Sequence, residues 1–482
     1  MSRSPLWRYL PLVAFLALLA APVSVATTVS VGLALAVSLL RVGGSLAGRA
    51  RARARAPSDA IALGRDQRGR QVTVTEADLS AHGLILGASG SGKTTTLTTI
   101  LEQQIRRGRP VVAIDMKGSP AFAAHLAEAA AAAGRPFKLW TPEGPTHWNP
   151  LQHGNATELK DKLICTERFT EPHYQRAAER YLQTILQVLQ SVHPDRPPTL
   201  TEVVELMDTR RLPAALRDVP RPLANRVQEY LPSITPDQRS AIRGLQTRLA
   251  IITESESAPY MAPASGAIDL SAALSGREVV VFSLNSSRYG QFAAQLGTLA
   301  VQDLICATGN RLEQRRQGHQ LEQATIAIDE FSGIGGAHMV ALFARGREAG
   351  VSGLVATQEM ADLDRLGRGV RDQVLGNTAV KLILRQDVPE SANLVAQLAG
   401  TEKVWEETRQ IGGSIFGGFP PGGTRREAEE FIIHPNAIKS LQTGDAVLIS
   451  KLRGGRAQTI RVTPPGRDRS ARPRYPDPGV TR

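Results

Sequence analysis

Short apolar runs alternate with longer amphipathic segments along most of the chain after Ala60. Runs of this kind, bounded by Gly and polar residues, are typical of strands buried on both faces of a parallel sheet, and the segments between them predict covering helices. The sequence therefore predicts an α/β fold with a parallel-sheet core. The predicted strands are 82–86, 110–118, 136–140, 277–284, 324–331, 353–358, 379–386, 444–451 and 457–463.

The stretch from about Ala156 to Ile252 has a different pattern, with helical periodicity and no strand-like run. In one segment Ala177, Tyr181, Ile185 and Leu189 recur at helical spacing, which predicts a buried helix face. We therefore expect an all-α insertion that divides the sheet domain in two, closed by a linker-like segment at 253–267. The expected organisation is an N-terminal anchor (1–44), a basic linker (45–59), the sheet domain (60–152 and 265–464), the insertion (153–264) and a disordered Pro- and Arg-rich tail (465–482).

The N-terminus carries no charged residue from about Leu10 to Leu40, which exceeds the roughly 20 apolar residues that one membrane helix needs. Pro22 lies near the middle of this run, so either one tilted helix or a hairpin of two helices fits. Arginines on both flanks favour cytoplasmic ends. A cleaved signal peptide is the alternative, and a phosphate-binding motif at Gly87 disfavours it because ATP is scarce outside the cell.

The formal net charge is +12, while the hydrophobic content of 42% is ordinary for a globular protein. A basic balance favours nucleic acid or an anionic membrane surface as partner, although arginines on solvated faces would also explain it. Cys165 and Cys306 stand alone and the nine histidines show no ligand spacing. These patterns favour a reducing compartment and give no sign of a structural metal site.

The segment from Gly87 to Thr94 has the G-x-x-x-x-G-K-[ST] pattern of a phosphate-binding loop between a predicted strand and a predicted helix. Its backbone N–H groups and the helix N-terminus suit ATP phosphates. Lys93 is expected to reach the β- and γ-phosphates and Thr94 to bind Mg²⁺. The expected nucleotide-binding residues are Gly87, Ala88, Ser89, Gly90, Ser91, Gly92, Lys93, Thr94 and Thr95.

Two further strand ends carry polar groups suited to phosphoryl transfer. Asp329 and Glu330 end one predicted strand; Asp329 suits the Mg²⁺ shell, and Glu330 suits a general base for the attacking water. Gln358 ends another, where it can contact the γ-phosphate or that water. Carboxyl ends of parallel strands share one edge of the sheet, so we expect these groups to meet.

Three arginines are candidates for stabilising transition-state charge at the γ-phosphate. Arg345 and Arg347 lie between the acidic pair and Gln358, and either could be inserted by a neighbouring subunit. Arg385 is a weaker candidate of the same kind. From the residues alone, a solvated helix end explains Arg345 and Arg347 equally well.

The order of LILGASGSGKT, AIDMKGS, WNPL, a helical insertion, IAIDEF, GREAGVSGLVATQ and NTAVKLILR resembles the coupling proteins of conjugative type IV secretion systems, within the FtsK/HerA-like superfamily of DNA pumps. The resemblance runs from about Ala60 to Val462. It implies a RecA-like P-loop ATPase core and gives Lys93, Thr94, Asp329, Glu330 and Gln358 their family roles. It also favours Arg347 as the inter-subunit arginine.

The resemblance further implies a membrane-anchored homohexamer in the bacterial inner membrane, with most of the chain in the cytoplasm. Its expected partners are single-stranded DNA, a relaxase with relaxosome proteins, and the secretion channel. The IDMKGS loop departs from the family pattern, which has Pro at the position of Met116 and an acidic residue at that of Ser119. This departure leaves the role of the loop open.

Three alternatives to a single-stranded DNA translocase remain at this point. One is a double-stranded DNA pump, although the tail after Val462 is short for a sequence-reading module. Another is a membrane adaptor that uses ATP to recruit protein cargo, whose ATPase would respond to protein and ignore DNA. A nucleotide-binding scaffold without hydrolysis is disfavoured by the intact Lys93, Asp329 and Glu330.

Overall fold

The computed structural model describes residues 59–167, 169–334, 336–367, 369–409, 423–451 and 457–466. The chain divides into two compact units, Met1–Ala60 and Ile61–Arg482, and the architecture below is that of the second unit. The predicted membrane anchor, the basic linker up to residue 58 and the tail after residue 466 lie outside the described residues. Among the residues described, no helix is long and apolar enough for a membrane span.

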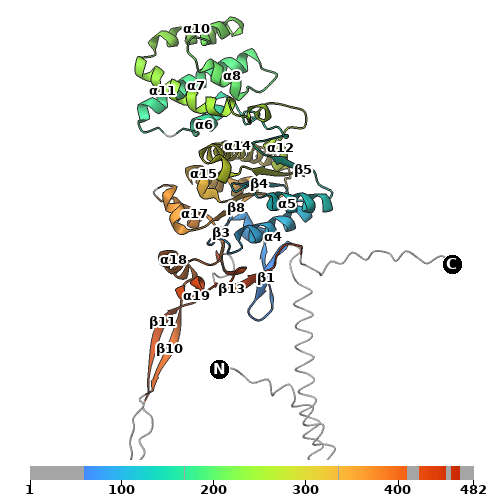
Figure 1. The fold of residues 1–482 in the computed structure, drawn as a ribbon, viewed down its shortest axis with the longest axis vertical. Coiled ribbons are helices and arrows are strands. Elements are labelled where there is room, and N and C mark those ends of the chain that lie inside the picture. Colours follow the sequence, from blue (N-terminus) through green and yellow to red (C-terminus); the bar gives the residue numbers. More distant parts are fainter. Residues whose placement is uncertain are drawn as a thin grey trace, which may run out of the picture. The chain divides into compact units, whose positions relative to one another are not determined.

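The predicted parallel sheet is confirmed at the centre of a larger mixed sheet, which has eleven strands among the described residues (Figure 1). Strands β9, β3, β8, β7, β4, β6 and β5 are parallel neighbours, and β12, β13 and β1 continue the sheet in antiparallel pairs. In spatial order the strands are β2 (Gln71–Thr75), β1 (Ala60–Asp66), β13 (Gln458–Val462), β12 (Asp445–Ser450), β9 (Val380–Ile383), β3 (Gly83–Leu86), β8 (Val351–Thr357), β7 (Ala324–Asp329), β4 (Val111–Asp115), β6 (Val279–Ser283) and β5 (Phe137–Trp140).

The central strands are buried on both faces, which explains their continuous apolar runs. In β4, Val111 and Ala113 belong to the hydrophobic cluster on one face, whereas Val112 and Ile114 belong to the cluster on the other. The first cluster contains residues of α4 (Lys93–Arg106) and α5 (Pro120–Ala132). The second contains residues of α12 (Leu270–Ser275), α14 (Gln291–Arg316) and α15 (Gly336–Ala349).

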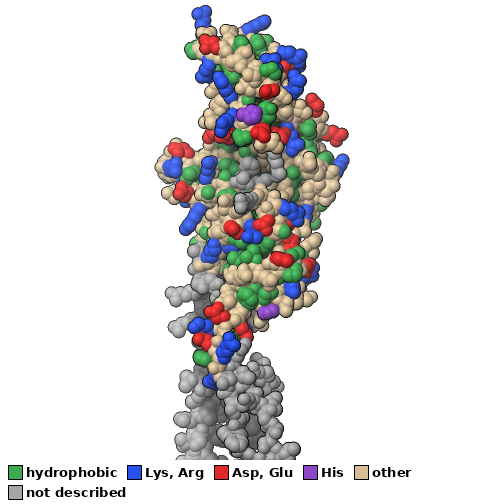
Figure 2. All heavy atoms as spheres, turned by 90° about the vertical axis from the view of Figure 1, so that its left-hand side faces the viewer, with side chains coloured by type: hydrophobic (Ala, Val, Ile, Leu, Met, Phe, Trp, Pro, Cys, Tyr) green, Lys and Arg blue, Asp and Glu red, His purple; other side chains and the backbone are tan. Residues whose placement is uncertain are grey.

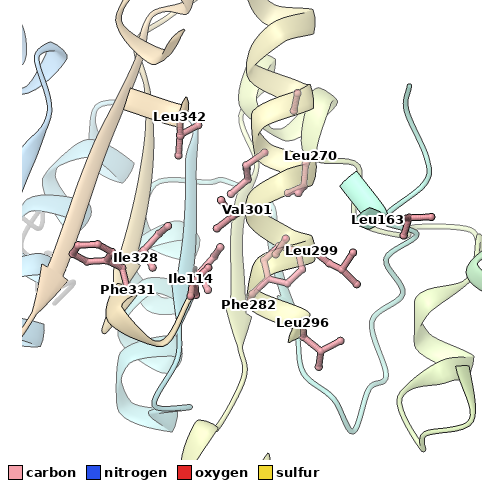
Figure 3. Close-up of a cluster of buried hydrophobic side chains, with 14 of the residues drawn as sticks. Ile114, Leu163, Leu270, Phe282, Leu296, Leu299, Val301, Ile328, Phe331 and Leu342 are labelled. Atoms are coloured by element: carbon pink, nitrogen blue, oxygen red, sulfur yellow. The ribbon is translucent and has the colours of Figure 1, made fainter. Parts of the chain in front are cut away.

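Helix α14 forms the middle of the second cluster (Figure 3). Its side chains Leu296, Leu299 and Val301 share this cluster with Ile114, Phe282 and Ile328 of the sheet and with Leu163 and Leu270 from outside the sheet. All eight are among the buried core residues. One long helix therefore connects the sheet core with residues of the helical insertion and of the segment that follows it.

The region predicted to be all-α contains only helices between residues 156 and 253. Three of its helices begin with reciprocal capping boxes, at Asn155, Thr199 and Thr235, which fix their N-termini locally. The elements are α6 (Ala156–Ile164), α7 (Pro172–Val192), α8 (Leu200–Leu206), α9 (Leu212–Ala215), η2 (Leu216–Asp218), α10 (Arg221–Tyr230), η3 (Leu231–Ser233) and α11 (Pro236–Thr253). The buried face predicted for 177–189 is confirmed on α7.

The remaining helices connect or flank the strands. They are α3 (Glu76–Ser80), η4 (Ala258–Met261), α13 (Ser286–Tyr289), η5 (Phe331–Gly333), α16 (Met360–Arg365), α17 (Val370–Asn377), α18 (Pro389–Ala399) and α19 (Pro435–Lys439).

Two pairs of strands were not predicted from the sequence. The β1–β2 pair begins the sheet domain, and β10 (Thr401–Arg409) pairs antiparallel with β11 (Gly423–Phe431) as a separate two-stranded arm. The arm is rich in charged residues on both strands, and its Trp405 is 67% exposed. A strand with polar residues on both faces has no period-two hydrophobic signal, so the pattern analysis missed it.

A buried ion pair joins the helical insertion to α14. Lys162 Nζ on α6 lies 2.7 Å from Asp303 Oδ1, and the two side chains are 3% and 5% exposed. The ammonium also donates to the carbonyl oxygens of Pro150 and His153, while Trp148 Nε1 donates to Asp303 Oδ2 over 2.9 Å. Because these partners saturate the buried charges, the pair fixes α6 against the core without an isolated charge.

We expect Lys162→Met to lower the free energy of unfolding by about 3–5 kcal/mol, because it leaves the Asp303 carboxylate buried without its cation. Pulse proteolysis across a urea series would measure the change. The matched control is Lys160→Met, since Lys160 pairs with an Asp161 side chain that is 63% exposed, and we expect it to cost less than about 1 kcal/mol. Equal shifts of the two unfolding midpoints would contradict the structural role of the buried pair.

Candidate nucleotide-binding site

The polar strand ends predicted to meet do lie at one edge of the sheet, the carboxyl edge, where the parallel strands end. In the register, Leu86 of β3 is opposite Thr357 of β8, and Asp115 of β4 is opposite Asp329 of β7. The loops that follow these strands therefore form one continuous rim. In open α/β sheets, ligands bind in this position, in the crevice outside the carboxyl ends of the strands.

The phosphate-binding loop joins β3 to α4 at this edge. Gly90 and Gly92 have φ angles of 72° and 110°, a left-handed conformation that side chains other than glycine rarely adopt. At Gly87, an added Cβ would lie 2.6 Å from Ser91 Oγ and 2.7 Å from Leu384 Cβ. The loop is thus a tight turn that admits no side chain where its backbone curls before the helix.

Lys93 and Thr94, the first residues of α4, point back into the site. Lys93 Nζ donates to the Gly87 carbonyl oxygen over 2.7 Å, and the Thr94 hydroxyl donates to Asp329 Oδ2 over 2.7 Å. The second bond joins the loop to the central strand β7. Burial lowers the pKa of Lys93, an effect that the neighbouring Glu330 opposes.

Glu330 follows Asp329 in the left-handed conformation, with φ of 58°. Its Oε1 accepts a hydrogen bond from Gln358 Nε2 over 3.1 Å and lies 3.6 Å from Lys93 Nζ. Non-glycine residues in this conformation are strained and cluster at functional sites. The structure therefore brings together Lys93, Thr94, Asp329, Glu330 and Gln358, as the sequence predicts.

Two buried oxygens at the site have no hydrogen-bond partner among the described residues. They are Asp329 Oδ1 and Ser91 Oγ. Burial raises the pKa of Asp329, while the hydrogen bond from Thr94 opposes that shift. A carboxylate oxygen beside a threonine hydroxyl is the donor set that Mg²⁺ takes in P-loop sites, and a hydroxyl inside the loop suits a phosphate oxygen.

One residue at the carboxyl edge was missed by the sequence analysis. Lys117, two residues after the end of β4, places its Nζ 2.6 Å from Glu330 Oε1. Its position just beyond a strand end at the shared edge is the signal that could have identified it. The adjacent Asp115 is 1% exposed, and burial raises the pKa of its carboxyl.

The candidate arginines do not share one position. Arg385 follows β9 at the carboxyl edge, where its carbonyl oxygen accepts the Ala88 N–H and its Nε lies 3.0 Å from Asp387 Oδ1. Arg345 and Arg347 are exposed on the last turns of α15, which leads into the start of β8. They lie toward the opposite, amino edge, and the seven residues of β8 separate the two edges by roughly 20 Å.

At the amino edge, His82 ties α15 to the strand that follows it. Its Nδ1 accepts the Gly353 N–H over 2.9 Å, and its Nε2 donates to the Phe343 carbonyl oxygen over 2.8 Å. The same edge has a cavity of about 330 Å³ lined by His82, Arg347 and Lys451, among other residues. Burial lowers the pKa of His82, and the charge of Arg347 adds to this effect. The ring is therefore neutral at pH 7, with the proton on Nε2.

Two family models match parts of the chain. The model described as the TraM recognition site of TraD and TraG matches residues 323–443, and that of the FtsK/SpoIIIE family matches residues 45–111. The two matches contain, respectively, the acidic pair with Gln358 and the phosphate-binding loop. Among curated proteins, none matches the sequence.

Solved structures share the fold at low sequence identity. The bacterial conjugative coupling protein TrwB, in its unbound monoclinic form, is 13% identical with a TM-score of 0.63, and the alignment covers 86% of this chain and 91% of that one. TrwB in complex with ADP and Mg²⁺ is 14% identical with a TM-score of 0.60, over 86% and 91%. VirB4 of Thermoanaerobacter pseudethanolicus is 16% identical with a TM-score of 0.56, over 85% and 97%. These likenesses establish a common architecture.

We expect the stability of the protein to fall as the pH drops below about 6.5, partly because the unfolded chain binds a proton at His82 that the folded chain resists. His82→Asn should make this decrease shallower, by at most about 1.4 kcal/mol per pH unit. Asparagine suits the φ of 63° at this position.

Urea midpoints between pH 5 and 7.5 would measure the effect. The control is His319→Asn, at an exposed histidine, which should keep the wild-type slope. A His82→Asn profile parallel to that of the wild type would contradict the buried neutral ring.

Proposed function

We propose that this chain, which belongs to the conjugative coupling proteins of the FtsK-like P-loop superfamily, is an ATP-driven translocase that delivers single-stranded DNA with its relaxase to a type IV secretion channel. The convergence of Lys93, Thr94, Asp329, Glu330 and Gln358 at one sheet edge is the observation that carries the proposal. A motor requires a nucleotide site whose groups can bind, hydrolyse and report on the γ-phosphate, and these five provide such groups.

ATP and Mg²⁺ are the expected ligands of this site. Solved structures of TrwB contain a non-hydrolysable ATP analogue in one case and ADP with Mg²⁺ in another. In the present chain, Thr94 and Asp329 would hold the cation, and the oxygen of Asp329 without a partner supports that assignment. When bound, the cation neutralises phosphate charge that develops during transfer.

The remaining groups act on the nucleotide and the water. Lys93, whose ammonium now donates to a carbonyl of the loop, would turn to the β- and γ-phosphates. Glu330 would accept the proton of the attacking water, and Gln358, bonded to Glu330, would sense whether the γ-phosphate is present. The hydrogen bond between them couples the base to the sensor.

Arg347 would complete the site of a neighbouring subunit. It lies toward the amino edge of its own sheet, and its own phosphate-binding loop lies at the carboxyl edge. A ring in which the amino edge of one subunit faces the carboxyl edge of the next would place an arginine at each γ-phosphate. This geometry supports a closed head-to-tail ring, for which the resemblance to the coupling proteins implies six subunits, and it favours Arg347 over Arg385, which belongs to the rim of its own site.

The net charge of the chain is weak support for DNA binding, because many of its arginines lie before Asp59 or after Gly466. Seven arginines and no acidic residue precede Asp59, and the tail after Gly466 is also basic. Figure 2 shows Lys and Arg side chains interspersed with Asp and Glu over the visible face of the described residues. Contact with DNA would therefore depend on local placement of cations, while the arginines around residues 49–55 suit an anionic membrane surface.

The membrane and protein partners follow from the same proposal. The uncharged run between Leu10 and Leu40 would anchor the chain in the inner membrane, with the sheet domain in the cytoplasm. The match to the TraM recognition site covers β10 and β11, so this arm and its exposed Trp405 are candidates for docking relaxosome proteins. The arm also favours the second candidate function, an ATP-dependent adaptor that recruits protein cargo.

We expect Glu330→Gln to bind ATP normally but to hydrolyse it at least about 100-fold more slowly, because the base is lost while the phosphate contacts remain. Lys93→Ala should lose ATP binding as well. The hydrolysis rates of both variants would be measured with the full chain in lipid nanodiscs. The assay would contain no DNA, single-stranded DNA or duplex DNA, each at two salt concentrations. Stimulation by single-stranded DNA that weakens with salt is expected. Stimulation by duplex alone favours a double-stranded pump, and stimulation only by relaxosome proteins favours the adaptor.

We expect Arg347→Ala to lower hydrolysis by about 10³-fold while leaving ATP affinity unchanged, because the arginine acts on transition-state charge. Mixing it with Lys93→Ala subunits should restore part of the activity, since each ring then contains interfaces with an intact loop facing an intact arginine. The control is Arg365→Ala, at an exposed arginine in an i,i+3 pair with Asp362, which should keep full activity. A mixture no more active than its components would argue against a trans role.

A further inference from the structure

Lys117 makes the shortest contact to the proposed catalytic base. Its Nζ lies 2.6 Å from Glu330 Oε1, and the two side chains are 41% and 12% exposed. Burial lowers the pKa of Lys117, but the hydrogen bond to Glu330 together with the negative charges of Asp329, Glu330 and Asp115 outweighs burial and raises the pKa above its usual value. The lysine is therefore a cation at neutral pH, and it has no part in the phosphate contacts described above.

The backbone of Lys117 is fixed independently of this contact. The buried carboxylate of Asp115 accepts the Lys117 N–H over 2.9 Å and the Ser119 N–H over 2.5 Å. Gly118, with φ of 70°, packs so closely against Asn285 that an added Cβ would lie 2.6 Å from Asn285 Cβ. The backbone at Lys117 is thus held in place, and the conformation of the lysine side chain determines where its ammonium lies.

Three side-chain nitrogens lie near the same oxygen of Glu330, Oε1. Lys117 is the closest, Gln358 Nε2 follows at 3.1 Å, and Lys93 Nζ is 3.6 Å away. A bound nucleotide would draw Lys93 to its phosphates, and Gln358 is neutral. Lys117 is then the cation that remains on Glu330. An oxygen of Glu330 that contacts the Lys117 ammonium at 2.6 Å is not free to accept a hydrogen bond from the attacking water.

We propose that Lys117 is a positioning residue that holds Glu330 in an ion pair and keeps ATP hydrolysis slow until the transported polymer is bound. The inference rests on the proposed function of Glu330 as the base. It assigns a role to the IDMKGS loop, whose function the sequence pattern leaves open.

The fold provides a route by which a bound polymer could release the pair. The Met116 carbonyl oxygen accepts the Ser286 N–H over 2.7 Å, which ties the loop to the segment that leads into α14. A cavity of about 590 Å³ lies between the start of α14 and the helical insertion, and its lining includes Arg248, Phe169 and Gln295. Gly333, three residues after Glu330, borders the same cavity. A ligand there would act on the segments that carry both members of the ion pair.

The test compares Lys117→Met with the wild type in the full chain in nanodiscs, by measuring kcat and KM for ATP with and without single-stranded DNA. We expect the DNA-free kcat to rise about ten-fold, the rate equivalent of one charge-assisted hydrogen bond, with KM unchanged. The DNA-stimulated kcat should stay near the wild-type value. Lys117→Arg should keep the low DNA-free rate.

Two controls make the result specific. Lys138→Met removes another partly buried lysine in an ion pair, with Glu278 at 3.1 Å, and should change neither rate. Adding Glu330→Gln to Lys117→Met should abolish the gain, since the lysine acts through the glutamate. Thermal unfolding checks that each variant folds, and Lys117→Gln replaces Lys117→Met if the methionine variant does not.

The outcomes separate the two proposals. A wild type that hydrolyses no ATP overturns the proposed function and, with it, this inference. A wild type that is active and stimulated by DNA, together with a Lys117→Met rate that is unchanged or lower without DNA, overturns the inference alone. If DNA does not stimulate the wild type but Lys117→Met still hydrolyses ATP faster than the wild type without DNA, the restraint by Lys117 stands. Its release by the polymer is then overturned.

Discussion

The hydrogen bond between Thr94 and Asp329 is the interaction on which the geometry of the site depends. It joins the first turn of α4 to the end of β7, across residues that are 235 positions apart in the chain. The bond sets the distance between the phosphate-binding loop and the acidic pair. Because Asp329 is 1% exposed and its second oxygen has no partner among the described residues, the site is organised around a buried acceptor that is only half satisfied. Such a group is costly unless a ligand completes it.

The sheet determines which side chains can lie near the hydrogen bond between Thr94 and Asp329. Its central strands are covered on both faces by helices, so polar side chains can gather only where the strands end. The carboxyl edge then holds the loop, both acids, the sensor glutamine and Lys117. The amino edge holds His82 and Arg347, about one strand length away. A subunit with acceptors at one edge and an arginine at the other is suited to head-to-tail assembly, in which the two edges of adjacent subunits meet.

The sequence predicted the part of the structure in which local pattern and buried environment agree. Each central strand was a short apolar run because both faces are buried, and the phosphate-binding loop was recognisable because its glycines meet a backbone requirement at Gly90 and Gly92. The arm of β10 and β11 was missed because charged residues occupy both its faces, which leaves no periodic signal. The β1–β2 pair was missed as well, although Ile61, Leu63, Val72 and Val74 alternate inward.

Side-chain partners were the least predictable feature. A lysine after a strand end gives no indication in the sequence of which acid it will contact, because that depends on how the neighbouring strand is aligned. The register that pairs Asp115 with Asp329 brings Lys117, two residues later, to Glu330, one residue later on the next strand. The position of the base, the restraint on it and the cation ligand thus all follow from one alignment of two adjacent parallel strands. A slip of one residue in that pairing would turn the side chains of the slipped strand to the other face of the sheet and would separate Lys117 from Glu330.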